Sequence, residues 1–210
     1  MSLLDRATTP PRSFFTRPAL ELAPELLGTI LIHHTAAGPV GGYIVETEAY
    51  RDSDDPGCHA YRGKTKRNWV LFEPGGHAYV YLIYGMYHCM NISASVAGEG
   101  TGVLIRAIEP LVGVDQMIAN RGTSRLNDLT SGPGRLTQAM DLDLGHLGLN
   151  LRDPESPLRL YRLPPKLRPQ YEICRSTRVN VHVEPSNTYL WRFFVKGNPH
   201  VSRPRVCVEC

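Results

Sequence analysis

Apolar and polar residues alternate with a period of two along several short stretches of the chain, which is typical of β-strands. This pattern predicts strands over about residues 29–34, 42–50, 103–108, 178–183 and 190–196. Residues 77–95 predict two further strands, joined by a tight bend at Gly85-Met86. Consecutive strands have short connections, which cannot form parallel crossovers, so we expect a mainly antiparallel sheet.

Helical periodicity appears in three places between the strands. Thr16 and Pro18 are start signals for a helix that ends at Gly28. A second helix is predicted to open at Glu109-Pro110, and a third at Ser131-Gly132-Pro133, running to about residue 140.

Two stretches rich in turn-forming residues, 51–76 and 153–170, predict loops and short extended pieces. The sum predicts an α+β fold: a single compact domain over residues 1–210, with a curved, mainly antiparallel sheet flanked by short helices. We expect residues 1–13 and 204–210 to be flexible ends.

Composition narrows the class of protein only slightly. The 210 residues, 42% hydrophobic and 20% charged, are ordinary for a globular protein. No apolar run approaches the ~18 residues needed to cross a bilayer, and no signal peptide is visible. We therefore expect a cytoplasmic protein, associated with the nucleoid if bacterial, without a membrane partner.

The five cysteines are scattered and odd in number, which favours reduced thiols over a disulfide framework. Cys207 and Cys210 are separated by two residues, with His200 upstream, but no second pair has zinc-finger spacing. The sequence thus favours a polar tail over a metal site, and we expect neither metal nor cofactor.

Charge and aromatic residues gather in two places that suit nucleic acid. A basic stretch contains Arg62, Lys64, Lys66 and Arg67, although such a cluster is more often a solvated surface. Four of the ten tyrosines fall within the nine residues 79–87. Core packing would explain any one of them, but the last stand at a predicted bend, where an aromatic side chain can protrude between stacked bases.

Glu46 and Glu48 lie two residues apart, so period-two geometry places both carboxylates, with Ile44 and Tyr50, on one face of a strand. Exposed glutamates on a strand are common. However, Arg106 lies within an apolar strand, where an unpaired arginine would be costly. If Arg106 neighbours Glu48, its charge favours an ionised carboxylate that can accept a proton from water.

The chain resembles the alkyladenine (3-methyladenine) DNA glycosylases. The resemblance rests on co-ordered segments that extend from about residue 20 to 202, and each alone would be weak. They are Val45-Glu46-Thr47-Glu48-Ala49-Tyr50, Tyr84-Gly85-Met86-Tyr87, Cys89-Met90-Asn91-Ile92-Ser93, Leu104-Ile105-Arg106-Ala107-Ile108-Glu109-Pro110 and Ser131-Gly132-Pro133.

The resemblance implies a role for each matching residue. Glu48 is the implied general base, and Arg106 and the main-chain carbonyl near Val181 help to hold the attacking water. The implied base pocket consists of Tyr50, His59, Tyr79, Tyr81, Asn91 and Leu104. Within it, Tyr50 and Tyr81 stack on the base, Tyr79 hydrogen-bonds His59, and Asn91 crowds the 2-amino group of guanine.

The resemblance also implies contacts with DNA. Tyr87 is the implied intercalating residue, with Tyr84 beside it. Lys64, Lys66, Arg67, Ser131, Gly132 and Arg135 are expected backbone contacts, the last three because the turn at Ser131 begins a helix. The acidic stretch 52–55 departs from this picture, and we expect it to lie away from the phosphates.

These features predict a monofunctional glycosylase of base excision repair that flips damaged purines from double-stranded DNA. Its substrates would be alkylated or deaminated bases such as 3-methyladenine, 7-methylguanine, hypoxanthine or ethenoadenine. We expect a monomer, without a Schiff-base lysine. Two alternatives stay open at this point: a non-catalytic nucleic-acid-binding module, and a glycoside hydrolase that uses Glu46 and Glu48.

Overall fold

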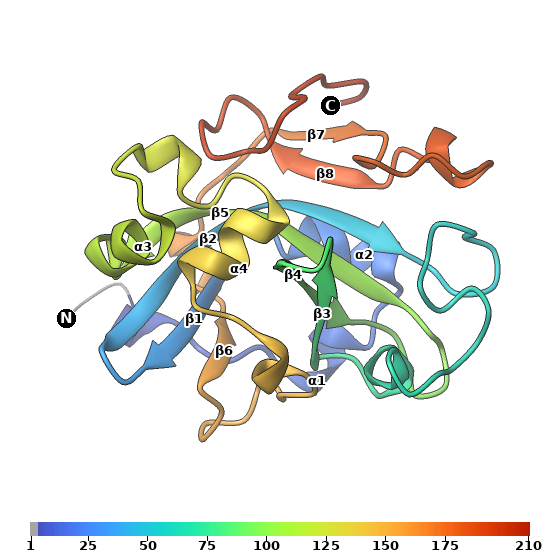
Figure 1. Ribbon diagram of the computed structural model, residues 1–210, viewed down its shortest axis with the longest axis horizontal. Coiled ribbons are helices and arrows are strands. Elements are labelled where there is room, and N and C mark those ends of the chain that lie inside the picture. The colour runs from blue at the N-terminus through green and yellow to red at the C-terminus, as the bar shows by residue number, and fades with distance from the viewer. Residues whose placement is uncertain (1–3) are drawn as a thin grey trace.

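The computed structural model describes residues 4–210, which form an eight-stranded antiparallel sheet with short helices packed against it (Figure 1). The strands are β1 (Ile30–Thr35), β2 (Gly38–Tyr50), β3 (Ala78–Ile83), β4 (Tyr87–Ser93), β5 (Gly102–Val112), β6 (Leu158–Tyr161), β7 (Ile173–Ser176) and β8 (Arg192–Val195). The α-helices are α1 (Arg12–Phe15), α2 (Ala19–Glu25), α3 (Val114–Arg121) and α4 (Pro133–Ala139). The predicted α+β class is confirmed.

The long strands β2 and β5 form the middle of the sheet. The strand order is β3-β4-β5-β2-β1-β6, and the far end of β2 also pairs with β8, which in turn pairs with β7. Glu46, Thr47 and Glu48 are therefore hydrogen-bonded to a strand on each side. This position fixes the backbone of the candidate catalytic carboxylates at the centre of the sheet.

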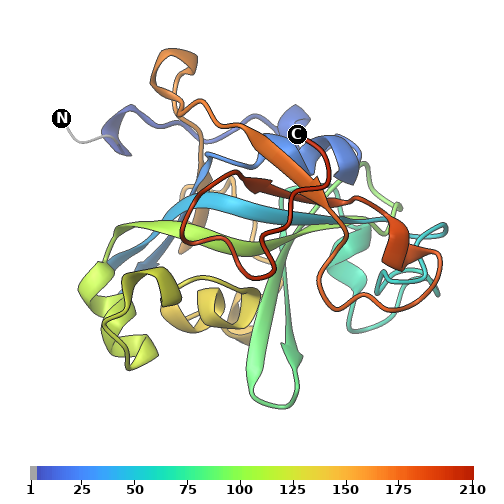
Figure 2. The same ribbon diagram turned by 90° about the horizontal axis from the view of Figure 1, so that it is seen from above.

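Helices cover both faces of the sheet. Figure 2 shows α1 and α2 on one side of β2 and β5, and α3 and α4 on the other, together with the protruding β3–β4 hairpin. Phe14, Phe15 and Leu22 are fully buried from the first side and Leu136 from the second. Each such side chain contributes about 1.5–3 kcal/mol by leaving water. No helix in the described part of the chain is long and apolar enough to span a membrane.

Three irregularities interrupt the pairing of β2 with β5: one between Gly41 and Gly42, and two adjacent bulges farther along the strands. Ile44 pairs with Ile108 and Glu46 with Ala107, which leaves Val45 without a partner. Directly afterwards Thr47 pairs with Ile105, which leaves Arg106 without one. Bulges re-aim side chains and are frequent next to active sites. Here they bring the Glu46 and Arg106 side chains together, and they break the simple alternation expected from the sequence.

The bulges correct one prediction. Ile44 was expected to share a face with Glu46 and Glu48, but Ile44 packs in the apolar core, whereas the two glutamates reach Arg106. A strict period of two does not continue across an extra residue.

The second predicted helix is present as α3, but its predicted start at Glu109-Pro110 is wrong. Strand β5 continues to Val112, with Pro110 opposite Gly42, and α3 begins only after Gly113. Gly113 adopts a positive φ of 69°, which a glycine accepts without strain and which turns the chain from strand into helix. Thr16 was predicted to start the first helix, but the N-cap of α2 is Pro18, and Thr16 does not cap it.

The predicted strand over residues 178–183 is absent from the described chain. Arg178 is buried in an ion pair with Asp55, and Asn180 has a positive φ of 61°, which interrupts an extended backbone. The strand that pairs with β8 is instead β7, five residues earlier than the predicted segment. Strand β6 lies within the predicted loop 153–170 and pairs with β1.

Candidate active site

A cavity of about 750 Å³ opens between the β3–β4 hairpin, the start of α4 and the segment 179–181. Most residues expected at the site lie in its wall. They are Tyr50, His59, Tyr79, Tyr81, Tyr84, Tyr87, Asn91, Leu104, Arg106, Ser131, Gly132, Arg135 and Val181. The fold therefore gathers residues from distant parts of the chain around one cavity.

Glu48 lies directly behind this wall and is fully buried. Its carboxylate accepts hydrogen bonds from the Tyr50 hydroxyl (2.9 Å), the Val179 backbone N–H (2.7 Å) and Arg106 Nη1 (3.4 Å). All three donors belong to residues that line the cavity. The carboxylate is thus held at one depth and orientation next to the cavity.

Arg106 joins Glu48 to a second buried carboxylate. Its Nε donates to Glu46 Oε1 at 2.8 Å, and its Nη2 donates to the Ser202 hydroxyl at 3.3 Å. Glu46 also accepts hydrogen bonds from Arg192 Nε (2.8 Å), the Ser202 backbone N–H (2.7 Å) and the Ser202 hydroxyl (2.8 Å). Every hydrogen-bonding nitrogen of Arg106 is engaged, which leaves the guanidinium little freedom to turn away from Glu48.

Electrostatics keep the Glu46 and Arg106 pair ionised. Burial alone would lower the pKa of Arg106, but the charges of Glu48 and Glu46 raise it above its ordinary value. Burial alone would raise the pKa of Glu46, but the charges of Arg106 and Arg192 hold it below its usual range. The site therefore contains a permanent positive charge beside Glu48.

Aromatic rings form another wall of the cavity. Tyr79 and Tyr81 stack with their centroids 5.0 Å apart, and His59 packs edge-on against Tyr81 at 4.6 Å. The Tyr79 hydroxyl and His59 Nδ1 form the expected hydrogen bond, at 3.0 Å. Burial, assisted by the charge of Arg67, lowers the pKa of His59, so the imidazole is neutral near pH 7.

Burial also shapes the other polar groups of the pocket. It raises the pKa of Tyr79 to about 12, and it holds the pKa values of Tyr50 and Tyr81 well above their ordinary value. All three phenols are therefore protonated donors. The buried Nδ2 of Asn91, which faces the same cavity, has no hydrogen-bond partner among residues 4–210. An unpaired buried donor of this kind is suited to hydrogen-bond an incoming ligand.

The tip of the β3–β4 hairpin is the most exposed aromatic point of the cavity rim. Tyr84 is 81% exposed with a positive φ of 50°, and Met86 is 68% exposed. Tyr87 is 43% exposed, and its Cβ lies close to Gly134 of α4. Tyr84 therefore projects farther into solvent than Tyr87.

The expected backbone-contact residues occupy different positions. Arg135 lies at the rim, but its Nη1 is bound to Asp128 (3.2 Å) and to the Ser131 hydroxyl (3.1 Å). Arg67 lies over the ring of Tyr81, with its guanidinium carbon 5.4 Å from the ring centroid. Lys64 pairs with Glu73, whereas Lys66 has no ion-pair partner in the described chain.

Several residues that shape the site were not predicted from the sequence. Arg178 stacks on Tyr50 and pairs with Asp55, which belongs to the acidic stretch 52–55, and both side chains are fully buried. Arg121 and Val179 also line the cavity. An arginine next to an apolar segment, as at Arg178-Val179, signals a buried ion pair, but its partner lies 123 residues away.

The cysteines correct another expectation. Cys174 and Cys207 form a disulfide, although reduced thiols were expected. Cys210 lies beside them, and none of the three lines the cavity. Backbone bridges also attach Glu209 to Arg175 and Thr8 to Arg162, so both terminal segments contact the sheet.

Comparison with known proteins agrees with this geometry. Residues 13–199 match the model of a family described as methylpurine-DNA glycosylase (MPG). A protein of Methanoculleus marisnigri is 45% identical over 195 residues, which cover 93% of this chain and 99% of that protein. A protein of Clostridium acetobutylicum is 42% identical over 201 residues, which cover 91% of this chain and 96% of that protein.

A third relative, from Bacillus cytotoxicus, is 41% identical over 201 residues and covers 92% of this chain and 98% of its own length. All three relatives carry the name "Putative 3-methyladenine DNA glycosylase". The family match covers most of the chain, and the relatives are similar over nearly their whole length. The chain therefore belongs to the methylpurine-DNA glycosylase family.

Proposed function

We propose that this DNA glycosylase flips an alkylated or deaminated purine out of duplex DNA into the 750 Å³ cavity and hydrolyses its bond to deoxyribose. The observation that carries the proposal is the contact between Glu48 and Arg106 directly behind the aromatic wall. A carboxylate held by a fixed cation next to a cavity is suited to orient and deprotonate one water molecule.

In the proposed step, the oxygen of that water forms a bond with C1′ as the N-glycosidic bond breaks. The bonding electron pair leaves with the base, and the water proton passes to the Glu48 carboxylate. The positive charge of Arg106 holds the carboxylate in place through an Nη1 contact of 3.4 Å. Val179 binds Glu48 through its backbone N–H, and the main-chain carbonyl near Val181, which also lines the cavity, would help to hold the water.

The aromatic wall favours bases that carry positive charge. Tyr50, Tyr81 and the neutral His59 present ring faces and edges to the cavity. Cation–π attraction contributes about 0.5–2 kcal/mol, and 3-methyladenine or 7-methylguanine would gain it while normal purines would not. Hypoxanthine and ethenoadenine are neutral, so their excision depends on hydrogen bonds, for which Asn91 Nδ2 is the available donor.

The sequence implied that Tyr87 intercalates. We assign this role to Tyr84 instead. The 81% exposure of Tyr84 at the hairpin tip supports this choice, whereas Tyr87 packs near Gly134. An exposed aromatic side chain at a hairpin tip can occupy the space that a flipped nucleotide leaves. Tyr87 then forms the rim beneath it.

A glycoside hydrolase mechanism has no support in this geometry. It needs two carboxylates that face the substrate. Both oxygens of Glu46 are occupied by Arg106, Arg192 and Ser202, so Glu46 acts as a positioning group for Arg106. A non-catalytic module is equally unsupported, because family membership identifies an enzyme.

The decisive experiment is excision of free base from alkylated DNA by the Glu48→Gln variant, without added metal or cofactor. We expect excision to be lost while affinity for abasic-site DNA is retained, since glutamine cannot accept the proton of the water. Glu155→Gln is the matched control, because Glu155 is exposed and does not line the cavity. Excision at the normal rate by the Glu48→Gln variant would contradict the mechanism.

The proposed substrate also bears on location and assembly. Since the enzyme acts on genomic DNA, we propose that it works in the cytoplasm. The cavity is formed by one copy of the chain, so a monomer is sufficient for the reaction. Sedimentation of the protein with and without abasic-site DNA tests this stoichiometry.

A further inference from the structure

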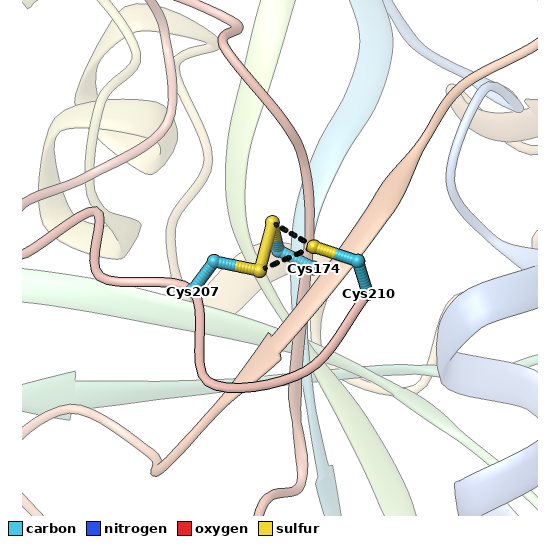
Figure 3. Close-up of side chains that lie close together, drawn as sticks. All are labelled: Cys174, Cys207 and Cys210. Atoms are coloured by element: carbon cyan, nitrogen blue, oxygen red, sulfur yellow. Dashed lines mark hydrogen bonds between the residues drawn. A yellow bond between two sulfur atoms is a disulfide. The ribbon is translucent and has the colours of Figure 1, made fainter.

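Three cysteine sulfur atoms meet at the C-terminal end of the chain (Figure 3). Cys174 comes from β7, whereas Cys207 and Cys210 come from the terminal segment. Cys174 and Cys207 form a disulfide, and Cys210 Sγ lies 2.9 Å from Cys207 Sγ and 3.5 Å from Cys174 Sγ. Within the described residues this is the one cluster of histidine, cysteine or acidic side chains whose ligand atoms, all within 4.8 Å of one another, could hold a metal ion.

We propose that these three cysteines, in their reduced form, bind a thiophilic divalent cation, Zn²⁺. Zinc binds thiolate sulfur at about 2.3 Å in a tetrahedral arrangement, which separates the sulfur atoms by roughly 3.8 Å. All three Sγ atoms lie within 4.8 Å of one another, so reduction of the disulfide and rotation of the side chains would bring them around one ion. The sequence did not reveal the site because its third ligand lies 33 residues before Cys207.

The reduced state is the relevant one for an enzyme that works on DNA. Compartments that contain DNA hold a thiol pool that keeps most cysteines reduced. A thiol reductant supplies two electrons and two protons to the Cys174–Cys207 disulfide and is itself oxidised to a disulfide. The three thiols then lose their protons to solvent as they coordinate the ion, which makes binding stronger as pH rises.

The surroundings suit a charged metal cluster. Three thiolates and one Zn²⁺ carry a net charge of −1, and Lys196 lies next to Cys210. Glu172, which pairs with Lys196 at 2.6 Å, also contacts Cys210. Water or the Glu172 carboxylate would complete the tetrahedron as an oxygen ligand.

The metal site would hold the C-terminal segment, residues 202–210, against β7, and Ser202 of this segment hydrogen-bonds Glu46. Val208 and Glu209 form backbone hydrogen bonds with Arg175, next to Cys174. Upstream in the same tail, the carbonyl groups of Ser202 and Pro204 accept hydrogen bonds from Arg192, which holds Glu46. A metal ion between β7 and the C-terminal segment would thus cross-link the chain on both sides of Ser202.

Cobalt titration of the reduced, full-length protein under anaerobic conditions tests the proposal. We expect one equivalent of Co²⁺ to give sulfur-to-cobalt charge-transfer absorption that Zn²⁺ then displaces. Cys174→Ser and Cys210→Ser should weaken binding by at least roughly tenfold, the scale found even for outer-sphere changes. Cys58→Ser is the control, since Cys58 is buried outside the cluster, and it should bind normally.

Absence of stoichiometric binding by the reduced protein would overturn the proposal, and so would unchanged binding by Cys210→Ser. The protein oxidised to the Cys174–Cys207 disulfide should not bind cobalt. A second measurement is thermal unfolding of the reduced protein, in which Zn²⁺ should raise the Tm of the unsubstituted chain but not that of Cys210→Ser. Both readouts are independent of base excision, so Glu48→Gln should bind cobalt normally.

Discussion

The guanidinium of Arg178 lies 4.4 Å from the ring centroid of Tyr50, so a permanent cation supports the back of a pocket wall. Arg178 is held there by two hydrogen bonds to Asp55, at 2.6 and 2.7 Å, and by one to the Ala49 carbonyl. The acidic stretch 52–55, which appeared out of place near DNA, thus supplies the buried counter-charge of a pocket residue.

Asp55→Ala should destabilise the protein by about 3–5 kcal/mol, because it leaves the Arg178 charge buried without a partner. The free energy of unfolding, measured by urea titration, checks this. Asp54→Ala is the matched control: Asp54 pairs with Arg51 at the surface, and its loss should cost less than about 1 kcal/mol. Equal losses in the two variants would contradict the structural role of Asp55.

Tyr84→Ala should weaken binding to lesion-containing DNA by about 1–3 kcal/mol, since it removes a side chain that replaces the stacking of the flipped base. Tyr87→Ala should have the smaller effect. Fluorescence anisotropy with abasic-site and intact duplexes measures both. If the Tyr87→Ala variant loses more affinity than Tyr84→Ala, the wedge is Tyr87, as the sequence suggested.

Lys66→Gln should lower affinity for all duplexes alike and reduce the slope of log affinity against log salt by about 1. Lys66 has no ion-pair partner in the structure described here, so its charge is available to a phosphate. Lys166→Gln, in the turn Pro165–Leu167 outside the cavity wall, is the control. An unchanged salt slope would place Lys66 away from DNA.

His33 should make stability depend on pH between neutrality and mild acid. Burial, together with the nearby His146, holds the pKa of His33 below 6.5, although its bond to the Met140 carbonyl opposes this. Because the folded-state pKa is depressed, the stabilisation is complete above pH 6.5 and is lost as the pH falls toward the folded-state value.

Urea midpoints at pH 7.5 and 5.5 test this expectation. The decrease between the two pH values should be smaller in His33→Gln than in the unsubstituted protein. His182→Gln, an exposed substitution, should retain the full decrease. Identical pH profiles for all three proteins would show that His33 is not the titrating group.

Local patterns predicted the elements that depend on nearby residues. The β3–β4 hairpin and the start of α4 agree with the sequence because Gly85 and Pro133 are strong local signals. The strand predicted over residues 178–183 is wrong because the conformation of this segment depends on Asp55 and Glu48, which are distant in sequence. For the same reason the sequence did not indicate the cluster of Cys174 with Cys207 and Cys210, which come from the end of the chain.

Resemblance to a family carries tertiary information that periodicity lacks, and most of the residues it indicated line one cavity; their roles remain predictions. Arg106 and Glu48 do meet. The sequence did not indicate the hydrogen bonds that hold Arg106 in place. Glu46 and Ser202 bind its Nε and Nη2, and Arg192 and Ser202 in turn bind Glu46.

The two bulges in the β2–β5 pair have opposite effects on strand alignment. Val45 adds a residue to one strand and Arg106 adds a residue to the other, so Ile44–Ile108 and Glu48–Leu104 are in the same phase. Deletion of either residue alone would shift the pairing of β2 with β5 by one residue on one side of the deletion. Deletion of both would restore regular pairing from Gly42 to Tyr50, but without the arginine. A single deletion therefore changes the pairing of half of β2, whereas the paired deletion keeps that pairing but removes Arg106, on which the proposed reaction depends.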